Sequence, residues 1–297
     1  MRTPLVPLAF LVMSLTATPA HASDAPAGTY RFKLGDFEIV ALKDAESRRP
    51  LDKLIANPEE IPKTGVTPED PTTLRVNAFL VDTGKELVMV DSGNGGSVGR
   101  TVANLEAAGY APERIGTVLL THLHGDHVGG MIADGKPTFP KAQVFVARRE
   151  AEFWIDPERE KTDARKAGMQ KARESLAPYE KAGRLTRFDG AREIVPGITA
   201  VPAYGHTPGH TAFMLESRGE KLLVWGDIVH VQQLQLPNPN VSLVFDVDAD
   251  AARDTRKAVL ARAAAEGYPV AGMHMAWPGI GHIIRKSGDG YAWEAVR

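Results

Sequence analysis

Four side chains that can bind a metal ion lie within six residues of one another in this sequence. They form the motif His122-x-His124-x-Asp126-His127. The apolar run at residues 116–120 comes directly before the motif and is typical of a buried strand, and the glycines that follow indicate a turn. Burying four such groups at a strand end without partners would cost several kcal/mol. Because a cation that binds all four removes this cost, the motif predicts a metal site.

Three more metal-capable residues, His206, Asp227 and His274, each lie just past an apolar run of strand character. Loops at strand ends carry functional groups on a rigid scaffold. His206 and His210 have the spacing of a helical ligand pair, but the proline and glycine between them disfavour that helix. We therefore do not expect these two histidines to bind one ion together, and we expect a structural role for His210.

The types of ligand indicate which metals and which chemistry to expect. The chain has no cysteine, so a metal site must use imidazole and carboxylate, which suit Zn²⁺ and also Mn, Co or Fe. Seven ligands are too many for one tetrahedral ion, but they suit two ions about 3.5–4 Å apart that share a carboxylate and a hydroxide. Such ions lower the pKa of bound water to about 7. The ligand set thus predicts a hydrolase that needs no serine or cysteine nucleophile, with two divalent ions, most simply Zn²⁺.

The full ligand set resembles that of the metallo-β-lactamase-fold hydrolases, whose fold is a four-layer αββα sandwich of the α+β class. Within that family the chain is most similar to the secreted methyl parathion hydrolase and lactonase branch. This similarity is carried by five segments, residues 34–39, 121–130, 150–154, 205–211 and 278–283.

The resemblance implies a role for each predicted ligand and for one residue behind the ligands. One ion would be bound by His122, His124 and His206, the other by Asp126, His127 and His274, and Asp227 would bridge the two. Asp227 and Asp126 are the predicted catalytic residues. Asp91, in the sequence Val-Asp-Ser-Gly, would orient a ligand histidine.

Mainly apolar and aromatic residues are the predicted walls of a substrate pocket. They are Trp154, Phe153, Phe245, Leu54 and His230, the last of which lies three residues after the bridging aspartate. Trp154 has the strongest support, because its segment matches the pocket wall of the family. An apolar pocket above two ions favours a neutral lactone, ester or phosphotriester over a charged substrate. None of the six tyrosines matches a family motif, so no general acid is assigned.

We therefore expect a binuclear metal-dependent hydrolase of neutral lactones and aryl esters, with phosphotriester hydrolysis as a side activity. A dedicated organophosphate hydrolase of the methyl parathion type is the main alternative. A β-lactamase is less favoured, because true β-lactamases often use another ligand at the position of Asp126. A non-enzymatic metal-binding protein is disfavoured, because two ions that share seven ligands keep open positions.

The expected elements alternate between groups of strands and helices. Strands are expected at residues 30–43 as a hairpin, at 76–81, 86–90, 116–120, 143–147, 184–188, 198–203, 211–216, 221–225 and 270–273, and in a last hairpin. Helices are expected at residues 97–109, in two pieces at 148–182, and at 249–266, and a long surface loop at 45–73. This pattern predicts two packed sheets with helices outside, in one domain spanning residues 23–297.

The amino terminus predicts export. Arg2 precedes an apolar run at residues 5–15, and Ala20-His21-Ala22 fits a small-x-small cleavage site. The run is too short to span a bilayer, so residues 1–22 are predicted to be a signal peptide and the protein periplasmic or secreted. The net charge of −2 provides no field to attract nucleic acid or an anionic membrane. The expected partner is a small neutral substrate, and the resemblance to the family also implies that two copies of the chain form a homodimer.

Overall fold

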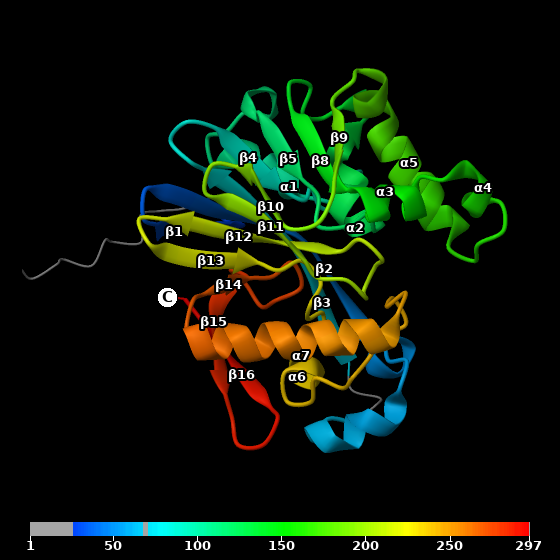
Figure 1. Ribbon diagram of the computed structural model, residues 1–297, viewed down its shortest axis with the longest axis vertical. Helices are drawn as coiled ribbons and strands as arrows, with labels where there is room; N and C mark the ends of the chain where they lie inside the picture. Colours follow the sequence, from blue (N-terminus) through cyan, green and yellow to red (C-terminus); the bar gives the residue numbers. More distant parts are fainter. Residues whose placement is uncertain (1–25, 68–70, 297) are drawn as a thin grey trace, which may run out of the picture.

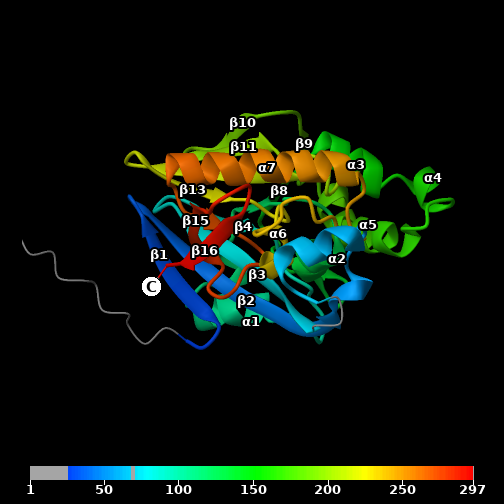
Figure 2. The same ribbon diagram turned by 90° about the horizontal axis from the view of Figure 1, so that it is seen from below.

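Two sheets packed face to face form the centre of the molecule. The computed structural model describes residues 26–67 and 71–296, and the predicted signal peptide lies outside them. Within the described residues both sheets have seven strands, and helices cover their outer faces (Figure 1). Figure 2 shows the layers from the side, with α1 (Thr101–Ala107) and α7 (Ala249–Glu266) on opposite sides of the strands. The predicted αββα sandwich of the α+β class is confirmed.

The first sheet has the strand order β1-β2-β3-β4-β5-β8-β9. Its strands are β1 Thr29–Leu34, β2 Phe37–Pro50, β3 Pro71–Asp82, β4 Leu87–Val90, β5 Thr117–Leu119, β8 Gln143–Ala147 and β9 Leu185–Phe188. Neighbours from β1 to β4 are antiparallel, and those from β4 to β9 are parallel. The segments that leave the carboxyl ends of the parallel strands therefore start from one edge of the sheet.

The second sheet has the strand order β10-β11-β12-β13-β14-β15-β16. Its strands are β10 Arg192–Val195, β11 Ile198–Pro202, β12 Thr211–Ser217, β13 Glu220–Val224, β14 Val270–Ala271, β15 Ile280–Arg285 and β16 Tyr291–Ala295. Only β13 and β14 are parallel neighbours among these described strands. A separate small hairpin joins β6 Ile132–Ala133 to β7 Lys136–Pro137.

Helices of both halves pack on the outer faces of the sheets. The first sheet carries α1, α3 Arg148–Trp154 and α5 Lys166–Lys181, and the second carries α7. The short helices α2 Gly125–Val128 and α4 Pro157–Glu160 contact α5, and α6 Gln232–Gln235 contacts the 3-10 helix at residues 58–64. Asp248 caps α7 by accepting a hydrogen bond from the N–H of Ala251, and Gly267 ends it at φ 73°. The predicted bounds of this helix are confirmed. Across the described residues, no helix combines the length and apolarity that a membrane span requires.

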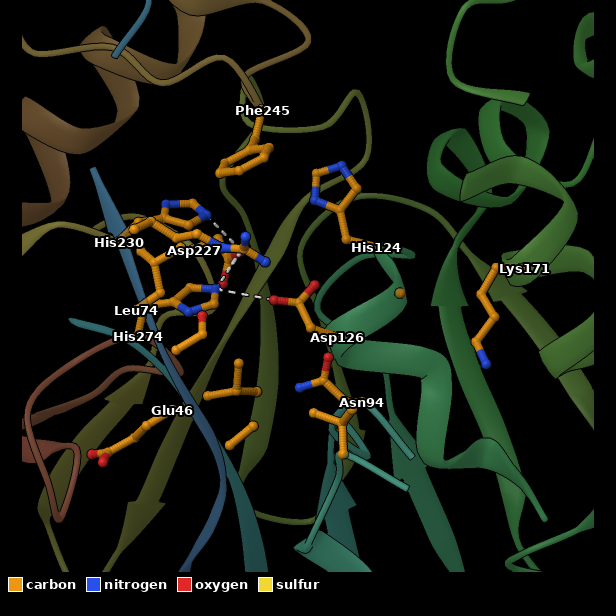
Figure 3. A pocket seen from close by; sticks show the side chains of 16 residues that line it. Glu46, Leu74, Asn94, His124, Asp126, Lys171, Asp227, His230, Phe245 and His274 are labelled. Atoms are coloured by element: carbon orange, nitrogen blue, oxygen red, sulfur yellow. Dashed lines mark hydrogen bonds and ion pairs between the residues drawn. The ribbon is translucent and has the colours of Figure 1, made fainter. Parts of the chain in front are cut away.

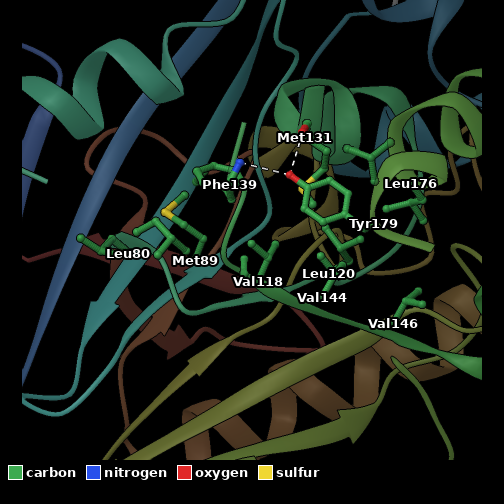
Figure 4. Close-up of a cluster of buried hydrophobic side chains, with 14 of the residues drawn as sticks. Leu80, Met89, Val118, Leu120, Met131, Phe139, Val144, Val146, Leu176 and Tyr179 are labelled. Carbon is green, nitrogen blue, oxygen red and sulfur yellow. Dashed lines mark hydrogen bonds between the residues drawn. The ribbon is translucent and has the colours of Figure 1, made fainter. Parts of the chain in front are cut away.

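Alternating residues of the first sheet face different cores. Along β2, Ile39 and Ala41 face the second sheet, whereas Val40 and Leu42 face the helices. Figure 4 shows part of the core beneath the helices, where the hydroxyl of Tyr179 in α5 donates to a main-chain carbonyl. Because central strands are buried on both faces, they read as continuous apolar runs in the sequence.

The predicted bounds of the surface loop, residues 45–73, are wrong at both ends. β2 continues to Pro50 and β3 begins at Pro71, and these two residues are paired. The prediction failed because this end of β2 is largely exposed, without the alternation of a half-buried strand. Between the strands lie two 3-10 helices, Leu51–Lys53 and Pro58–Thr64. Side chains of residues 51–61 and of residues 231–243 form a buried cluster that includes Leu51, Leu54, Ile55 and Ile61.

Two helical predictions also differ from the structure. The helix expected from residue 97 begins at Thr101, because residues 97–100 form a loop that Asp44 holds from another strand. The carboxylate of Asp44 accepts the N–H groups of Arg100 and Thr101 at 2.8 and 2.9 Å. Residues 148–182, expected to form two helices, form three, which are α3, α4 and α5. The short strand β10 was not predicted, since three of its four residues are polar or only partly buried.

Candidate metal centre

The predicted ligands come together at one edge of the sandwich. Residues 122–127 follow β5 of the first sheet, whereas His206, Asp227 and His274 follow β11, β13 and β14 of the second. Because β13 and β14 are parallel, the segments after them leave from the same edge. Nε2 of His274 accordingly lies 3.1 Å from Oδ2 of Asp227. Both sheets therefore contribute to the same centre.

The first group of ligand atoms belongs to His122, His124, His206 and Asp227, and all lie within 4.8 Å of one another. Nδ1 of His124 lies 3.0 Å from Nε2 of His122 and 2.9 Å from Nε2 of His206. Both Nε2 atoms lie 3.4 Å from Oδ2 of Asp227. Ligands placed tetrahedrally around zinc at its usual bond lengths are about 3.3 Å apart. The spacing of this group therefore fits a bound ion.

The second group consists of Asp126, His127 and His274. Oδ2 of Asp126 lies 3.8 Å from Nε2 of His127 and 3.6 Å from Nε2 of His274. The same two nitrogens lie 3.2 and 3.1 Å from Oδ2 of Asp227. One oxygen of Asp227 thus faces both groups, which is the position of a bridging ligand.

The surroundings of Asp227 support binding of a cation. Its side chain is buried, and Oδ2 lies within 3.4 Å of the Nε2 atoms of five rings, those of His122, His127, His206, His230 and His274. Figure 3 shows His230 and His274 beside Asp227. Among the described residues, Oδ1 of Asp227 and Nε2 of His127 are buried without a hydrogen-bond partner. Each unsatisfied buried group costs about 1–3 kcal/mol. Ions bound to these atoms would remove that cost, so the donor set fits two metal ions.

Partners behind the rings fix which nitrogen faces the centre. Nδ1 of His127 donates to Asp91 at 2.7 Å, and Nδ1 of His206 donates to Asp246 at 2.9 Å. Nδ1 of His274 donates to a main-chain carbonyl of β3. With the proton held on Nδ1, each ring turns the lone pair of Nε2 toward the other ligands. The position of Asp91 is that expected of a residue that orients a ligand.

Burial and neighbouring charges set the protonation of the ligand rings. Burial, with nearby imidazoles, lowers the pKa of His122 and His124 well below 6.5. Both rings are then neutral at pH 7, as metal ligands must be. Burial also acts to lower the pKa of His206, but the hydrogen bonds and charges of Asp227 and Asp246 raise it to about 9. A cation that binds His206 therefore displaces a proton at neutral pH.

Two residues of the centre were missed by sequence reasoning. Asp246 lies 40 positions from His206, so no local spacing links the two. Glu150 is fully buried and accepts the N–H of Leu123 at 3.0 Å and that of Gly209 at 2.8 Å. It thereby ties together the loop that carries His122 and His124 and the loop that carries His206. The sequence marked residues 150–154 only as similar to the family, and nothing in their spacing indicated this role.

A cavity of about 660 Å³ opens over the centre. Two of the predicted pocket residues, Phe245 and His230, line it (Figure 3). Phe245 is 41% exposed and lies at the mouth, and the ring of His230 stacks on His274 at 4.5 Å. The other lining residues come from β2, β3, the loop after β4, α2 and α5, and include Glu46, Arg49, Leu74, Val76, Asn94, Val98, Asp126 and Lys171.

Three predicted pocket residues lie outside the cavity lining. Trp154 is buried, and its ring packs edge-on against His124 at 4.9 Å, so it supports a ligand. Phe153 packs against Trp154 and lies under the guanidinium of Arg159 at 4.5 Å. Leu54 belongs to the buried cluster beside residues 231–243. Apolar residues near a site are equally suited to the core, and sequence alone could not separate these two locations.

His210 has the structural contacts expected of it. Its Nδ1 donates to the carbonyl of Ala203 at 3.0 Å, and its Nε2 accepts the N–H of Asp227 at 3.0 Å. Its ring thus holds the main chain of the shared aspartate and is not part of either ligand group.

Clustered histidine and aspartate side chains that could hold metal ions, at one edge of an αββα sandwich, are typical of a metal-binding protein. The sequence profile described as the metallo-beta-lactamase superfamily matches residues 71–274, and the chain belongs to this family.

Curated relatives match about half of the chain. An uncharacterized protein YobT from Bacillus subtilis is 29% identical over 157 residues, which are 53% of this chain and 63% of the relative. An N-acyl homoserine lactonase from Bacillus sp is 27% identical over 175 residues, 51% of this chain and 62% of the relative. The chain therefore covers less than two thirds of either relative.

Two solved structures match nearly the whole fold. A hydrolase of the beta lactamase superfamily, AbOPH, is 34% identical with a TM-score of 0.83, and the match covers 91% of this chain and 98% of that one. AidC, described as a dizinc quorum-quenching lactonase in complex with the product N-hexanoyl-L-homoserine, is 25% identical with a TM-score of 0.82, covering 92% and 99%. Neither similarity singles out the methyl parathion hydrolase branch, which stays a prediction.

Proposed function

We propose that the protein is a hydrolase of neutral lactones and aryl esters that uses a binuclear centre, with Zn²⁺ as the expected metal. The observation that carries this proposal is the single oxygen of Asp227 that faces both ligand groups on the floor of the cavity. The likeness to a dizinc lactonase and to an N-acyl homoserine lactonase supports the lactone as substrate class.

The residues of the cavity suit an uncharged substrate. Two ions bound to the ligands would polarise the substrate carbonyl and lower the pKa of a water molecule to about 7. The side chain of Asp126 is 31% exposed and lines the cavity, so its carboxylate would accept a hydrogen bond from the attacking water. Phe245 and the stacked ring of His230 would contact the apolar part of the substrate.

A substrate panel on protein reconstituted with Zn²⁺, Co²⁺ or Mn²⁺ tests this function. We expect hydrolysis of an aryl lactone and an aryl ester, with the bound metal measured by elemental analysis. The proposal is contradicted if none of the reconstituted forms hydrolyses either substrate. If the protein hydrolyses a cephalosporin faster than it hydrolyses the lactone, the alternative function of a β-lactamase is favoured.

We propose phosphotriester hydrolysis as a side activity of the same centre. No tyrosine of the described residues lines the cavity, and a nitrophenolate leaving group needs little help from a general acid. Because phosphotriester hydrolysis is proposed only as the side activity, we expect kcat/KM for a lactone to exceed kcat/KM for a dialkyl aryl phosphorothioate. A higher kcat/KM for the phosphorothioate than for the lactone would indicate a dedicated organophosphate hydrolase.

We also propose that the protein is exported and dimeric. The charged start, apolar run and cleavage pattern of residues 1–22 support export. Mass spectrometry of the secreted or periplasmic protein should find Ser23 as the first residue, and light scattering should give twice the mass of one chain.

A further inference from the structure

The second ligand group is complete only when a loop of the second sheet is held against the first sheet. Asp126 and His127 belong to α2, which follows β5 of the first sheet, whereas His274 lies in the loop at residues 272–279, between β14 and β15 of the second. Figure 3 shows His274 facing Asp126. The position of this loop therefore decides whether the three side chains can share one ion.

Asn77 of β3 holds the loop on both sides of His274. Its main-chain N–H donates to the carbonyl of Met273 at 2.8 Å. Its side-chain Nδ2 donates to the carbonyl of Met275 at 3.1 Å and to that of Gly272 at 3.4 Å. One residue of the first sheet thus binds the main chain directly before and directly after the ligand.

The same strand fixes the imidazole. Nδ1 of His274 donates to the carbonyl of Arg75, two residues before Asn77. Main-chain groups of residues two apart in a strand point to the same side, so Arg75 and Asn77 both reach the loop. β4 pairs with β3 only as far as Phe79, and the edge of β3 beyond this point is therefore open to the loop.

The amide of Asn77 and the loop fit closely together. Asn77 is buried, and the two carbonyls that it meets can only accept, so the nitrogen of the amide must face them. Gly279 has a φ of 79°, and a Cβ there would lie 2.9 Å from Nδ2 of Asn77 and 3.1 Å from the carbonyl oxygen of Gly272. Without the amide, the buried carbonyls would lack a donor, and the loop would have to move to satisfy them.

A different residue supports the first ligand group. Glu150 accepts the N–H groups of Leu123 and Gly209, in the loops that carry three ligands of that group. Apart from its strand pairing, the hydrogen bonds of Asn77 within the described part of the chain all go to the 272–279 loop. A change at Asn77 should therefore act on the second group and leave the first intact.

We propose that Asn77 is a positioning residue, which sets the affinity of the second ligand group for its ion by fixing the loop that carries His274. This inference rests on the binuclear centre of the proposed function, and it adds that separate residues behind the ligands control the two ions. Residues that orient a metal ligand commonly change the affinity by about 10–100-fold.

Stepwise binding of Zn²⁺, measured by competition with a chromophoric chelator, tests the proposal without using activity. Asn77→Leu replaces the amide by an apolar group of similar shape. We expect one of the two dissociation constants to rise about 10–100-fold and the other to stay at its wild-type value. At a Zn²⁺ concentration between the two constants, elemental analysis should find one ion per chain in the variant and two in the wild type.

A double-mutant cycle shows whether Asn77 acts through His274. His274→Ala removes the ligand, so adding Asn77→Leu to it should cause no further loss of affinity. A purely structural role of Asn77 would weaken binding in both backgrounds. If Asn77→Leu fails to fold, Asn77→Ser takes its place, because a serine hydroxyl is too short to reach both carbonyls.

Asn238 provides a matched control. It is also buried, and its Nδ2 donates to the carbonyl of Glu60 at 3.2 Å, in the 3-10 helix at residues 58–64. Asn238→Leu therefore removes the same kind of hydrogen bond from a residue outside both ligand groups. We expect this variant to lose stability and to keep both dissociation constants.

Three results would overturn the proposal: wild-type constants in the Asn77 variant, an equal rise of both constants, or a further loss of affinity in the His274→Ala background. If the variant keeps the wild-type constants while the wild type binds two ions, the inference fails and the proposed function stands. If the wild type binds fewer than two ions, the proposed binuclear centre fails together with the inference.

Discussion

Asp227 is the residue on which the centre depends most, because its Oδ2 faces both ligand groups. Asp227→Asn keeps the shape but replaces one oxygen by a nitrogen that cannot bridge two cations. We expect the bound metal to fall from two ions to one or none, and kcat/KM to fall more than 100-fold. About 100-fold is the upper range for a residue that only orients a ligand. Elemental analysis and lactone kinetics measure both effects.

Two other aspartate-to-asparagine variants provide the comparison for the loss of metal and activity in Asp227→Asn. Asp246→Asn, behind His206, should cost about 10–100-fold, since it disturbs the ring orientation but removes no ligand. Asp189→Asn removes an exposed carboxylate that, within the described part of the chain, pairs only with Arg148, and it should change neither metal content nor kcat/KM. Retention of two ions in Asp227→Asn would show that this residue does not bridge.

Glu150 should make the stability of the fold depend on pH. Burial raises its pKa from 4.5 to about 7, so the folded chain keeps a proton that the unfolded chain loses above pH 4.5. The stability it contributes is fully present below pH 4.5 and is lost as the pH rises through 7, by about 3 kcal/mol. Glu150→Gln does not titrate, so its free energy of unfolding should fall less steeply over this window. Urea denaturation between pH 4.5 and 7.5 measures the difference.

The neighbouring acid on the same helix provides the control. Glu152 is exposed, and Glu152→Gln should follow the wild-type pH dependence. Parallel curves for wild type and Glu150→Gln would show that the buried carboxyl does not take up a proton in this range.

At the scale of elements, the sequence predicted what local patterns determine. β8 and α7 have the predicted bounds, because β8 is a compact apolar run and α7 has a capping aspartate and a terminal glycine. The clustering of the seven predicted ligands followed from the sequence, since few roles other than metal binding explain such a set. The extension of β2 over residues 45–50 depends on its pairing with β3, and the contact of Asp246 with His206 also joins distant segments. Local spacing holds no information about such pairing.

The long helix α7 positions the segment that carries His230 and Phe245. Arg256, buried in this helix, donates to the carbonyls of Ile228, Pro239 and Val241 at 2.8–2.9 Å. Burial lowers its pKa to about 10, so it stays charged at neutral pH. Arg256→Met removes the donor of the Ile228 and Pro239 carbonyls, while that of Val241 keeps the bond from Gln235, and it should lower the free energy of unfolding by about 3 kcal/mol. Urea denaturation measures this loss.

The same substitution should also raise KM, because the wall of the cavity loses its support. Lys257→Met, on the exposed side of α7 next to Arg256, is the matched control and should change the stability by less than about 0.5 kcal/mol. Equal stability of the two variants would mean that the segment is held by other contacts.

At the scale of the whole molecule, the centre joins the two sheets. The first ligand group takes His122 and His124 from the first sheet, and His206 and Asp227 from the second. The second group likewise combines Asp126 and His127 with His274. Ions bound there would link the two halves of the sandwich across their shared edge, in addition to the apolar core between the sheets.

Removal of metal should therefore destabilise the whole fold as well as abolish activity. Ions that bind only the folded chain stabilise it by about 2.7 kcal/mol per site at 100 times their Kd. For a chain of this size two such sites correspond to a rise in Tm of about 10 °C. We expect chelation to lower Tm by this amount in calorimetry, and Zn²⁺ to restore it. In Asp227→Asn, which lacks the shared ligand, chelation should shift Tm much less. An unchanged Tm after complete removal of metal from the wild type would show that the ions do not link the sheets.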